Sequence, residues 1–433
     1  MERITVKTKP IEGQKPGTSG LRKKTHVFMG PHYLENFVQA IWNGIGGAGG
    51  KTFVLGGDGR YFNDRAAQVI LRMAAASGAK KVIVGQNALL STPAASNLIR
   101  KRKTDGGIIM SASHNPGGPD KDFGVKFNTP NGGPAPEDVT NRIFAATKNL
   151  ASYDIVETQD IDLSTVGTTT LDGMEIEVVD PVADYAELME TLFDFDRIRA
   201  LFAGGFTMRF DAMHAVTGPY ATRILEGQLG APKGTVINGT PSPDFGGGHP
   251  DPNPIWAKPL VDLMMSADAP DFAAASDGDG DRNMILGRGI YVTPSDSLAV
   301  LAANAKLAPA SNQGTRRRSR RHRTPRPRLR QGPRRCRALH ADLRRRRSGR
   351  QGQGHFLLRD ADGLEVLRQS SRCRKGHALR RGIRRHRLRP RARERRSLGR
   401  SSLAQHSRRD RQVGEGDPGR PLAHPWTQLL LAP

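Results

Sequence analysis

The stretch "TFVLGGDGRYFNDRAAQVILRMAAASGAKKVIVG", from Thr52 to Gly85, contains two apolar runs separated by a segment with helical spacing. The runs "TFVLGG" and "KKVIVG" are short and apolar, which predicts buried strands. Between them, "DRAAQVILRMAAASG" has the apolar spacing of a helix and ends at Gly78, since glycine is common at helix ends. A strand, a helix and a strand in this order predict a parallel sheet, so the fold class is α/β.

The alternation continues along the chain. "TPAASNLIRKR", residues 92–102, begins with Thr-Pro, a helix start signal, and "GGIIMSAS", residues 106–113, predicts a third strand. A second unit begins with a predicted helix over residues 182–202 and again alternates strands with helices up to a final helix that starts at "PSDSLAV". These patterns predict two α/β domains, residues 1–190 and residues 191–305.

Charge is distributed unevenly along the 433 residues. Residues 1–312 carry 30 Lys and Arg against 34 Asp and Glu, whereas the remainder carries 37 against 8, so the net charge of +25 comes entirely from the C-terminal part. Both cysteines, Cys336 and Cys373, also lie there. Residues 1–312 therefore offer no disulfide and no thiol metal site, which suits a reducing cytoplasm. The N-terminus lacks a signal-peptide core and no apolar run is long enough to span a membrane, so we expect a cytoplasmic protein.

The segment "SDGDGDRN" places Asp277, Asp279 and Asp281 at alternate positions after an apolar run. Carboxylates this close together repel one another unless a cation neutralises them, and oxygen-only ligands favour Mg²⁺ or Ca²⁺. A solvated acidic turn is the alternative, but three aspartates in five residues, followed by Arg282, favour a metal site. The spacing also resembles a calcium-binding loop, yet no glutamate follows at the twelfth position.

The segment "SASHNPGGP" sets Ser113 beside His114 where the third predicted strand ends. Taken singly, an ordinary turn serine and a satisfied loop histidine are the more common interpretations. Open α/β sheets bind ligands at the carboxyl ends of their strands, however, which favours a functional loop. No G-x-S-x-G motif is present, so a serine hydrolase is disfavoured, and a serine that carries a phosphoryl group opposite a metal is better motivated.

Basic and hydroxyl groups elsewhere suit an anionic ligand. "KPGTSGLRKK" offers backbone N–H groups together with Thr18, Ser19 and Arg22. Lys126, in "GVKFN", follows the Ser-His loop closely enough to neutralise phosphate or to move a proton, although most lysines at such spacing are surface residues. Neither segment is specific alone, and the same holds for "GGDGRYFN" at the end of the first strand.

Together these motifs carry a family resemblance. "PGTSGLRKK", "GGDGRYFN", "SASHNPGGP", "DFGVKFNTPNGGPAPE", "FGGGHPDPNP" and "SDGDGDRNMILG" occur in the order found in the phosphoglucomutases of the α-D-phosphohexomutase superfamily, and they cover essentially all of residues 1–310. The sequence resembles the glucose-specific branch in the long loop after His114. The resemblance implies a multi-domain phosphohexomutase fold with two intact α/β domains.

The resemblance also implies roles for the residues that match its motifs. Ser113 would be the phosphoserine, and Mg²⁺ would be bound by a phosphoserine oxygen and the carboxylates of Asp277, Asp279 and Asp281. The reaction centre would be lined by Arg22, His114 and Lys126, and the substrate would also contact Thr18, Ser19 and Arg282. The implied reaction interconverts glucose 1-phosphate and glucose 6-phosphate through glucose 1,6-bisphosphate, with Lys126 or His114 moving the hydroxyl proton.

The arginine-rich tail departs from the family pattern. Family members continue into a sugar-binding third domain and a phosphate-binding fourth domain, and neither is visible in residues 306–433. A polybasic nucleic-acid-binding arm is one interpretation, because clustered arginines neutralise phosphates. The tail has few aromatic residues for base stacking and matches no nucleic-acid-binding fold, so no nucleic acid partner is expected.

A frameshift after about residue 310 explains the tail better. "LRDADGLEVLRQS", residues 358–370, permits codons that one base later encode YETPTGWKFFGN, which resembles the phosphoglucomutase third domain. GC-rich codons read out of register also yield many arginines. We therefore expect residues 306–433 to be an out-of-frame tail that is disordered, since low apolar content and high charge do not offset the entropy of ordering. The chain as translated is expected to lack activity, because half of the substrate clamp is missing.

Overall fold

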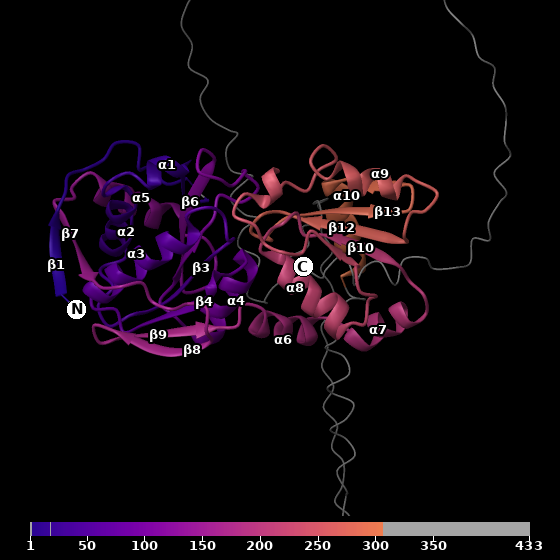
Figure 1. Ribbon diagram of the computed structural model, residues 1–433, viewed down its shortest axis with the longest axis horizontal. Coiled ribbons are helices and arrows are strands. Elements are labelled where there is room, and N and C mark those ends of the chain that lie inside the picture. The colour runs from indigo at the N-terminus through magenta and orange to yellow at the C-terminus, as the bar shows by residue number, and fades with distance from the viewer. Residues whose placement is uncertain (1, 18, 306–433) are drawn as a thin grey trace, which may run out of the picture. The chain divides into compact units, whose positions relative to one another are not determined.

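The computed structural model describes residues 2–17 and 19–305, and these residues form an α/β structure with helices on both faces of two sheets (Figure 1). The predicted α/β fold class is confirmed for this part of the chain. Thr18 and the arginine-rich tail lie outside the described residues, as do the predictions of a disordered tail and of a polybasic arm. Within the described ranges, no helix is long and apolar enough to cross a membrane.

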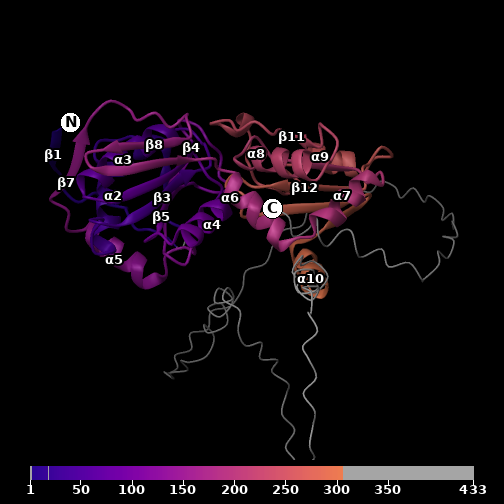
Figure 2. The same ribbon diagram turned by 90° about the horizontal axis from the view of Figure 1, so that it is seen from below.

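The first sheet has seven strands in the order β2-β6-β5-β3-β4-β9-β8. Its centre is parallel, since β3 pairs in parallel with β4 and β5, and β4 with β9, while the remaining pairs are antiparallel. The strands are β2 (Leu21–Lys24), β3 (Thr52–Gly57), β4 (Lys81–Leu89), β5 (Gly107–Met110), β6 (Asp122–Asn128), β8 (Gly167–Leu171) and β9 (Met174–Val179). A separate antiparallel pair joins β1 (Glu2–Lys7) to β7 (Ser152–Glu157) (Figures 1 and 2).

Helices cover both faces of this sheet because successive side chains of a strand point to opposite faces. Phe53 and Leu55 of β3 belong to one core, whereas Val54 belongs to another. The first core includes the helices α1 (Thr25–Phe28), α2 (Tyr33–Gly44), α3 (Asn63–Ala76) and α5 (Glu137–Thr147), and the second includes α4 (Thr92–Arg102) and α6 (Ala183–Leu192). The strand, helix and strand predicted from Thr52 to Gly85 are β3, α3 and β4.

The second sheet has the order β11-β10-β12-β13-β14 and is also mixed. The core on one face contains Phe272 and Ala274 of β12 and is continuous with the core around α6, whereas Ala273 and Ala275 pack on the other face. Its strands are β10 (Met208–Asp211), β11 (Val236–Ile237), β12 (Phe272–Ser276), β13 (Asn283–Gly287) and β14 (Ile290–Val292). Its helices are α7 (Phe195–Ala203), α8 (Thr217–Ala221), the π-helix η1 (Thr222–Gln228), the 3₁₀-helix η2 (Phe245–Gly247), α9 (Lys258–Met264) and α10 (Pro294–Asn304).

The single helix predicted over residues 182–202 is wrong, because two helices occupy this segment. Helix α6 ends at Leu192, and Phe193 has an extended backbone. The side chain of Asp194 accepts a hydrogen bond from the backbone N–H of Arg197 at 3.1 Å and so caps a new helix, α7. Aspartate favours such caps because its carboxylate satisfies an otherwise free N–H group. The predicted domain boundary at residue 190 falls inside α6 and stays a prediction.

Candidate functional site

Two loops from different sheets meet at the predicted serine and aspartates. Ser113 lies three residues beyond the end of β5, and Asp277 directly follows β12. The hydroxyl of Ser113 donates a hydrogen bond to Oδ2 of Asp277 at 2.8 Å, and both side chains are buried. The structure therefore brings together two segments that are 164 residues apart in the sequence.

The three predicted metal ligands form one compact cluster. Carboxylate oxygens of Asp277, Asp279 and Asp281 lie within 4.8 Å of one another. The loop is folded around Asp277, whose Oδ1 accepts hydrogen bonds from the backbone N–H groups of Asp281 and Arg282, both at 3.0 Å. The alternation of aspartate with glycine thus points three carboxylates at one place.

The glycines between the aspartates are required by close packing. A Cβ atom on Gly278 would lie 2.5 Å from the carbonyl oxygen of Ser113 and 3.1 Å from Cγ of Pro250. Gly280 has a φ of +77°, and a Cβ atom there would lie 2.7 Å from Cγ2 of Thr217. Residues without a side chain therefore let the aspartate loop approach the serine loop.

The three aspartates differ in pKa because their surroundings differ. Burial and the charges of Asp279 and Asp281 raise the pKa of Asp277 to about 8. Burial also raises the pKa of Asp279, but the nearby Lys126 ammonium outweighs it and holds that pKa below its ordinary value. Burial, followed by the charge of Asp279, raises the pKa of Asp281. The positive charge near the cluster is too small to stabilise all three carboxylates in their ionised form.

The cluster fits a divalent cation. All three donors are carboxylate oxygens, the ligand type that hard divalent cations prefer. Oδ1 of Asp279 is buried and has no hydrogen-bond partner among the described residues, although a buried polar atom is normally satisfied. An ion bound by the three aspartates would both satisfy this atom and lower the mutual repulsion.

Lys126 extends from β6 to the same cluster. Its ammonium donates to Oδ2 of Asp279 and to Oγ1 of Thr92, both at 2.9 Å. The Thr92 hydroxyl in turn donates to Oδ2 of Asp279 at 2.7 Å. No pattern in the sequence predicted this role of Thr92, because the Thr-Pro signal only marked the start of a helix.

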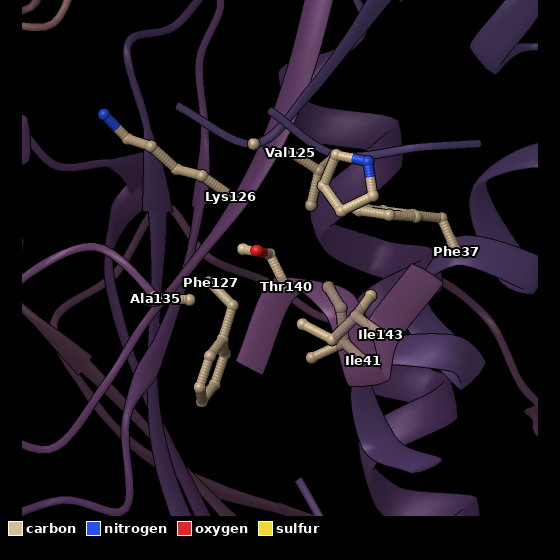
Figure 3. A pocket seen from close by; sticks show the side chains of 10 residues that line it. Phe37, Ile41, Val125, Lys126, Phe127, Ala135, Thr140 and Ile143 are labelled. Carbon is tan, nitrogen blue, oxygen red and sulfur yellow. The ribbon is translucent and has the colours of Figure 1, made fainter. Parts of the chain in front are cut away.

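A small apolar cavity lies behind the strand that carries Lys126. Figure 3 shows its walls and shows the Lys126 amine pointing away from them. The cavity measures about 10 Å³, roughly the smallest space that admits one water molecule. The lining residues are Pro16, Gly20, Phe37, Ile41, Val125, Lys126, Phe127, Ala135, Thr140 and Ile143. The Lys126 amine therefore takes no part in this apolar packing and extends to the aspartates.

The predicted anion-binding loop lies beside Lys126. Gly20 packs so closely that a Cβ atom there would lie 2.4 Å from the carbonyl oxygen of Val125. Ser19 is exposed in a turn between Gly17 and Gly20, whose backbones exchange two hydrogen bonds. Arg22 follows on β2; burial lowers its pKa, and the charge of Asp279 partly restores it. Its Nε is buried without a partner in the described part of the chain.

His114 and Arg282 form a direct contact across the two loops. Nδ1 of His114 lies 2.5 Å from an Nη atom of Arg282. Because arginine only donates, Nδ1 is the acceptor, and the neutral ring carries its proton on Nε2. Burial, then the positive charge of Arg282, lowers the pKa of His114. The predicted residues His114, Lys126, Arg282 and the aspartates are thus assembled around Ser113.

Comparison with known proteins agrees with this geometry. Family models for α/β/α domains I and II of phosphoglucomutase/phosphomannomutase match residues 13–154 and 183–289, which together make up more than half of the chain. The chain belongs to this family. The matches include the serine loop, Lys126, Arg22 and the three aspartates.

Individual relatives support the phosphoglucomutase branch. The phosphoglucomutase of Rhizobium radiobacter is 60% identical over 310 residues, which cover 72% of this chain and 57% of that protein. The phosphoglucomutase of Aspergillus fumigatus is 53% identical over 308 residues, which cover 70% of this chain and 55% of that protein. The chain thus spans about half the length of the curated relatives it matches.

A solved structure has a similar fold. The exocytosis-sensitive phosphoprotein pp63/parafusin of Paramecium, a phosphoglucomutase solved in an open form, matches with a TM-score of 0.68 and 48% identity. The match covers 71% of this chain and 58% of that one. The resemblance drawn from the sequence motifs is therefore confirmed at the level of the family.

Proposed function

We propose that the described residues form the phosphoryl-transfer site of a phosphoglucomutase, an enzyme that interconverts glucose 1-phosphate and glucose 6-phosphate through glucose 1,6-bisphosphate, and that this chain, which is not expected to complete the full reaction, retains the transfer to and from Ser113. One observation carries the proposal: the buried hydroxyl of Ser113 lies 2.8 Å from Asp277 in a cluster of three carboxylates. A serine in this place is suited to hold a phosphoryl group beside a cation. The relatives are named phosphoglucomutases, which supports glucose as the proposed sugar.

In the proposed reaction the phosphoryl group starts on Ser113. The bond between phosphorus and Oγ of Ser113 breaks as a free hydroxyl of the sugar monophosphate bonds to phosphorus, and the proton of that hydroxyl is transferred through the protein to Oγ. The glucose 1,6-bisphosphate so formed then returns its other phosphoryl group to Ser113. Phosphorylated Ser113 is regenerated, and the isomeric monophosphate is released.

The proposed cation is Mg²⁺, held by Asp277, Asp279, Asp281 and an oxygen of phosphorylated Ser113. When bound, it would neutralise negative charge on the transferring group. Arg22 would add a second positive charge on the side of β2.

The proposed proton carrier is His114 or Lys126. His114 is held by Arg282 through Nδ1, which leaves its Nε2–H to donate a proton to a substrate, and the Lys126 ammonium lies within the aspartate cluster. Arg282 and the turn that contains Ser19 would bind the phosphate of the sugar, and the same role is proposed for Thr18, which lies outside the described residues. A cytoplasmic location is also proposed, because residues 1–312 contain no cysteine.

The test follows the half-reaction at Ser113, since the chain spans about half the length of its relatives. The full chain is incubated with glucose 1,6-bisphosphate and Mg²⁺, and peptides that contain Ser113 are analysed by mass spectrometry. We expect one phosphate on Ser113 and an equal amount of glucose monophosphate in solution. Removing the metal with EDTA should suppress the reaction.

Ser113→Ala is the control, because it removes one buried oxygen and should leave the fold intact. It should accept no phosphate and release no monophosphate. A folded wild-type chain that never carries phosphate on Ser113 would overturn the proposal. Phosphate found only on another serine would do the same.

A further inference from the structure

A buried ion pair beside the serine loop has no part in the proposed chemistry. Asp58 and Arg60 follow β3, and both side chains are completely excluded from solvent. Arg60 binds Asp58 with two N–H groups, Nε at 2.9 Å from Oδ1 and an Nη atom at 2.8 Å from Oδ2. Charged side chains are almost never fully buried unless they are paired.

The remaining N–H groups of Arg60 bind backbone carbonyl oxygens around the reaction centre. One Nη atom donates to the carbonyl of Ser113 at 2.7 Å. The other donates to the carbonyls of Asn115, at 3.2 Å, and Asp122, at 2.8 Å. All five N–H groups of the guanidinium are thus used, and three of them fix the chain on either side of the loop "SHNPGGPDKD".

The conformation held in this way is unusual. Ser113 has a φ of +56°, in the left-handed region that side chains other than glycine seldom adopt. Such a conformation persists only where the surroundings fix it, and it is common at functional sites. The Ser113 N–H donates to Oγ of Ser111 at 2.7 Å, and Arg60 binds the carbonyl, so both ends of the residue are held.

The second sheet's loops close over the guanidinium. The ring of Phe245 lies over Arg60, with 5.2 Å from its centroid to Cζ. The neighbouring Tyr61 N–H donates to the carbonyl of Pro243 at 2.8 Å. A Cβ atom on Gly117 would lie 2.4 Å from that carbonyl, so the serine loop is packed against the same segment.

We propose that Arg60 is a positioning residue that holds Ser113 in its left-handed conformation and so aims the hydroxyl at the aspartate cluster. Asp58 orients Arg60, and Phe245 covers it. The contacts of Arg60 do not depend on the proposed function. The effect of Arg60 on a reaction rate rests on the proposed phosphoryl transfer to Ser113. Lysine cannot replace Arg60, because its three donors radiate from one atom and do not match five acceptors spread around a planar fork.

The main test compares Arg60→Lys with Arg142→Lys in the full chain by hydrogen exchange and mass spectrometry. Arg142 is an exposed control for the same chemical change, since it also binds a carboxylate, that of Asp138 at 3.0 Å, and a carbonyl, that of Gly44 at 3.1 Å. We expect Arg60→Lys to speed exchange in peptides over residues 111–122 at least about tenfold, while β4 and α2 keep wild-type rates. Arg142→Lys should leave residues 111–122 unchanged.

Equal exchange rates over residues 111–122 in a folded Arg60→Lys variant would overturn the inference. Faster exchange spread evenly over both sheets would do so as well, because it would mean only a general loss of stability. If Arg60→Lys is too unstable to measure, the double variant with Ser113→Gly decides. Glycine adopts the positive φ freely, so the double variant should regain part of the lost melting temperature, whereas additive losses would contradict the proposal.

Phosphate uptake supplies the functional readout. In Arg60→Lys, transfer from glucose 1,6-bisphosphate to Ser113 should fall about 100-fold, the loss expected for a misplacement of about 1 Å, with Mg²⁺ affinity retained within a few-fold. Wild-type uptake in the folded variant would refute a positioning role. A wild-type chain that takes up no phosphate would refute the proposed function, and the exchange comparison would still decide the role of Arg60.

Discussion

Replacing Gly278 with alanine tests how tightly the aspartate loop is joined to the serine loop. The new Cβ atom would lie 2.5 Å from the Ser113 carbonyl oxygen, and a contact of at least about 3.0 Å is needed, so the loops must separate by about 0.5 Å. Movement of the aspartate loop away from Ser113 is opposed by a hydrogen bond, because the Gly278 N–H donates to the carbonyl of Pro250 at 3.1 Å.

The expected losses follow from that displacement. Overpacking of this kind costs about 1–3 kcal/mol, which corresponds to a fall in melting temperature of roughly 3 to 10 °C. A misplacement of about 1 Å costs about 100-fold in rate, so about 0.5 Å should slow phosphate transfer to Ser113 about tenfold. The measurements are thermal unfolding by circular dichroism and the rate at which Ser113 acquires phosphate.

Gly227→Ala is the matched control. Its Cβ atom would have only the carbonyl oxygen of Thr222 within 4 Å, at an ordinary distance of 3.7 Å, and alanine is the better helix former. The control should therefore match or exceed wild-type stability. If Gly278→Ala unfolds within 1 °C of the control and transfers phosphate within about twofold of wild type, the reasoning about this contact is refuted.

Three further predictions concern charge, pH and the coding sequence. Lys126→Met should destabilise the metal-free chain by about 3–5 kcal/mol in urea unfolding, because it leaves a buried carboxylate without its cation; an unchanged unfolding midpoint would contradict this. Burial raises the pKa values of Tyr33, Tyr153 and Tyr220 from 10.0 to about 12, so stability should be lost as pH rises from about 10 to about 12, and phenolate absorbance should appear together with unfolding; absorbance that rises fully before unfolding would show these rings to be accessible. Sequencing the DNA for residues 300–345 should reveal a one-base shift that restores a frame resembling the third domain of phosphoglucomutase. The prediction is contradicted if resequencing and the same gene from related strains both give the present reading frame.

Local patterns predicted much of the fold. The run from Thr52 to Gly85 folds as predicted, because its strands are buried on both faces and its helix has one apolar face. The prediction failed at Asp194, where the apolar spacing continues across the junction. The carboxylate of Asp194 accepts a hydrogen bond from the backbone N–H of Arg197 at 3.1 Å and starts a new helix there. A pattern of apolar residues along the sequence does not reveal a single hydrogen bond of this kind.

The positions of the site residues were predicted better than the contacts that support them. Ser113 and the aspartates are recognisable because each follows an apolar strand, and the carboxyl ends of strands in α/β sheets gather ligands. Arg60 and Thr92 were not assigned roles, since their partners are distant in the sequence. Arg60 binds mostly backbone carbonyls, which every residue possesses, so no particular residue type at positions 113, 115 or 122 could have revealed the contact.

The division of the site between two loops has a consequence for how the chain is made. A ribosome synthesises Ser113 and Lys126 more than 150 residues before the aspartates that they contact. Domains commonly fold in the order of their synthesis, so the first sheet can form while both side chains still face water. The contact between the serine loop and the aspartate loop then forms in one late event, when β12 and the loop that follows it leave the exit tunnel and dock, and a nascent chain arrested before Asp277 would hold a folded first sheet without the three carboxylates proposed to bind the cation.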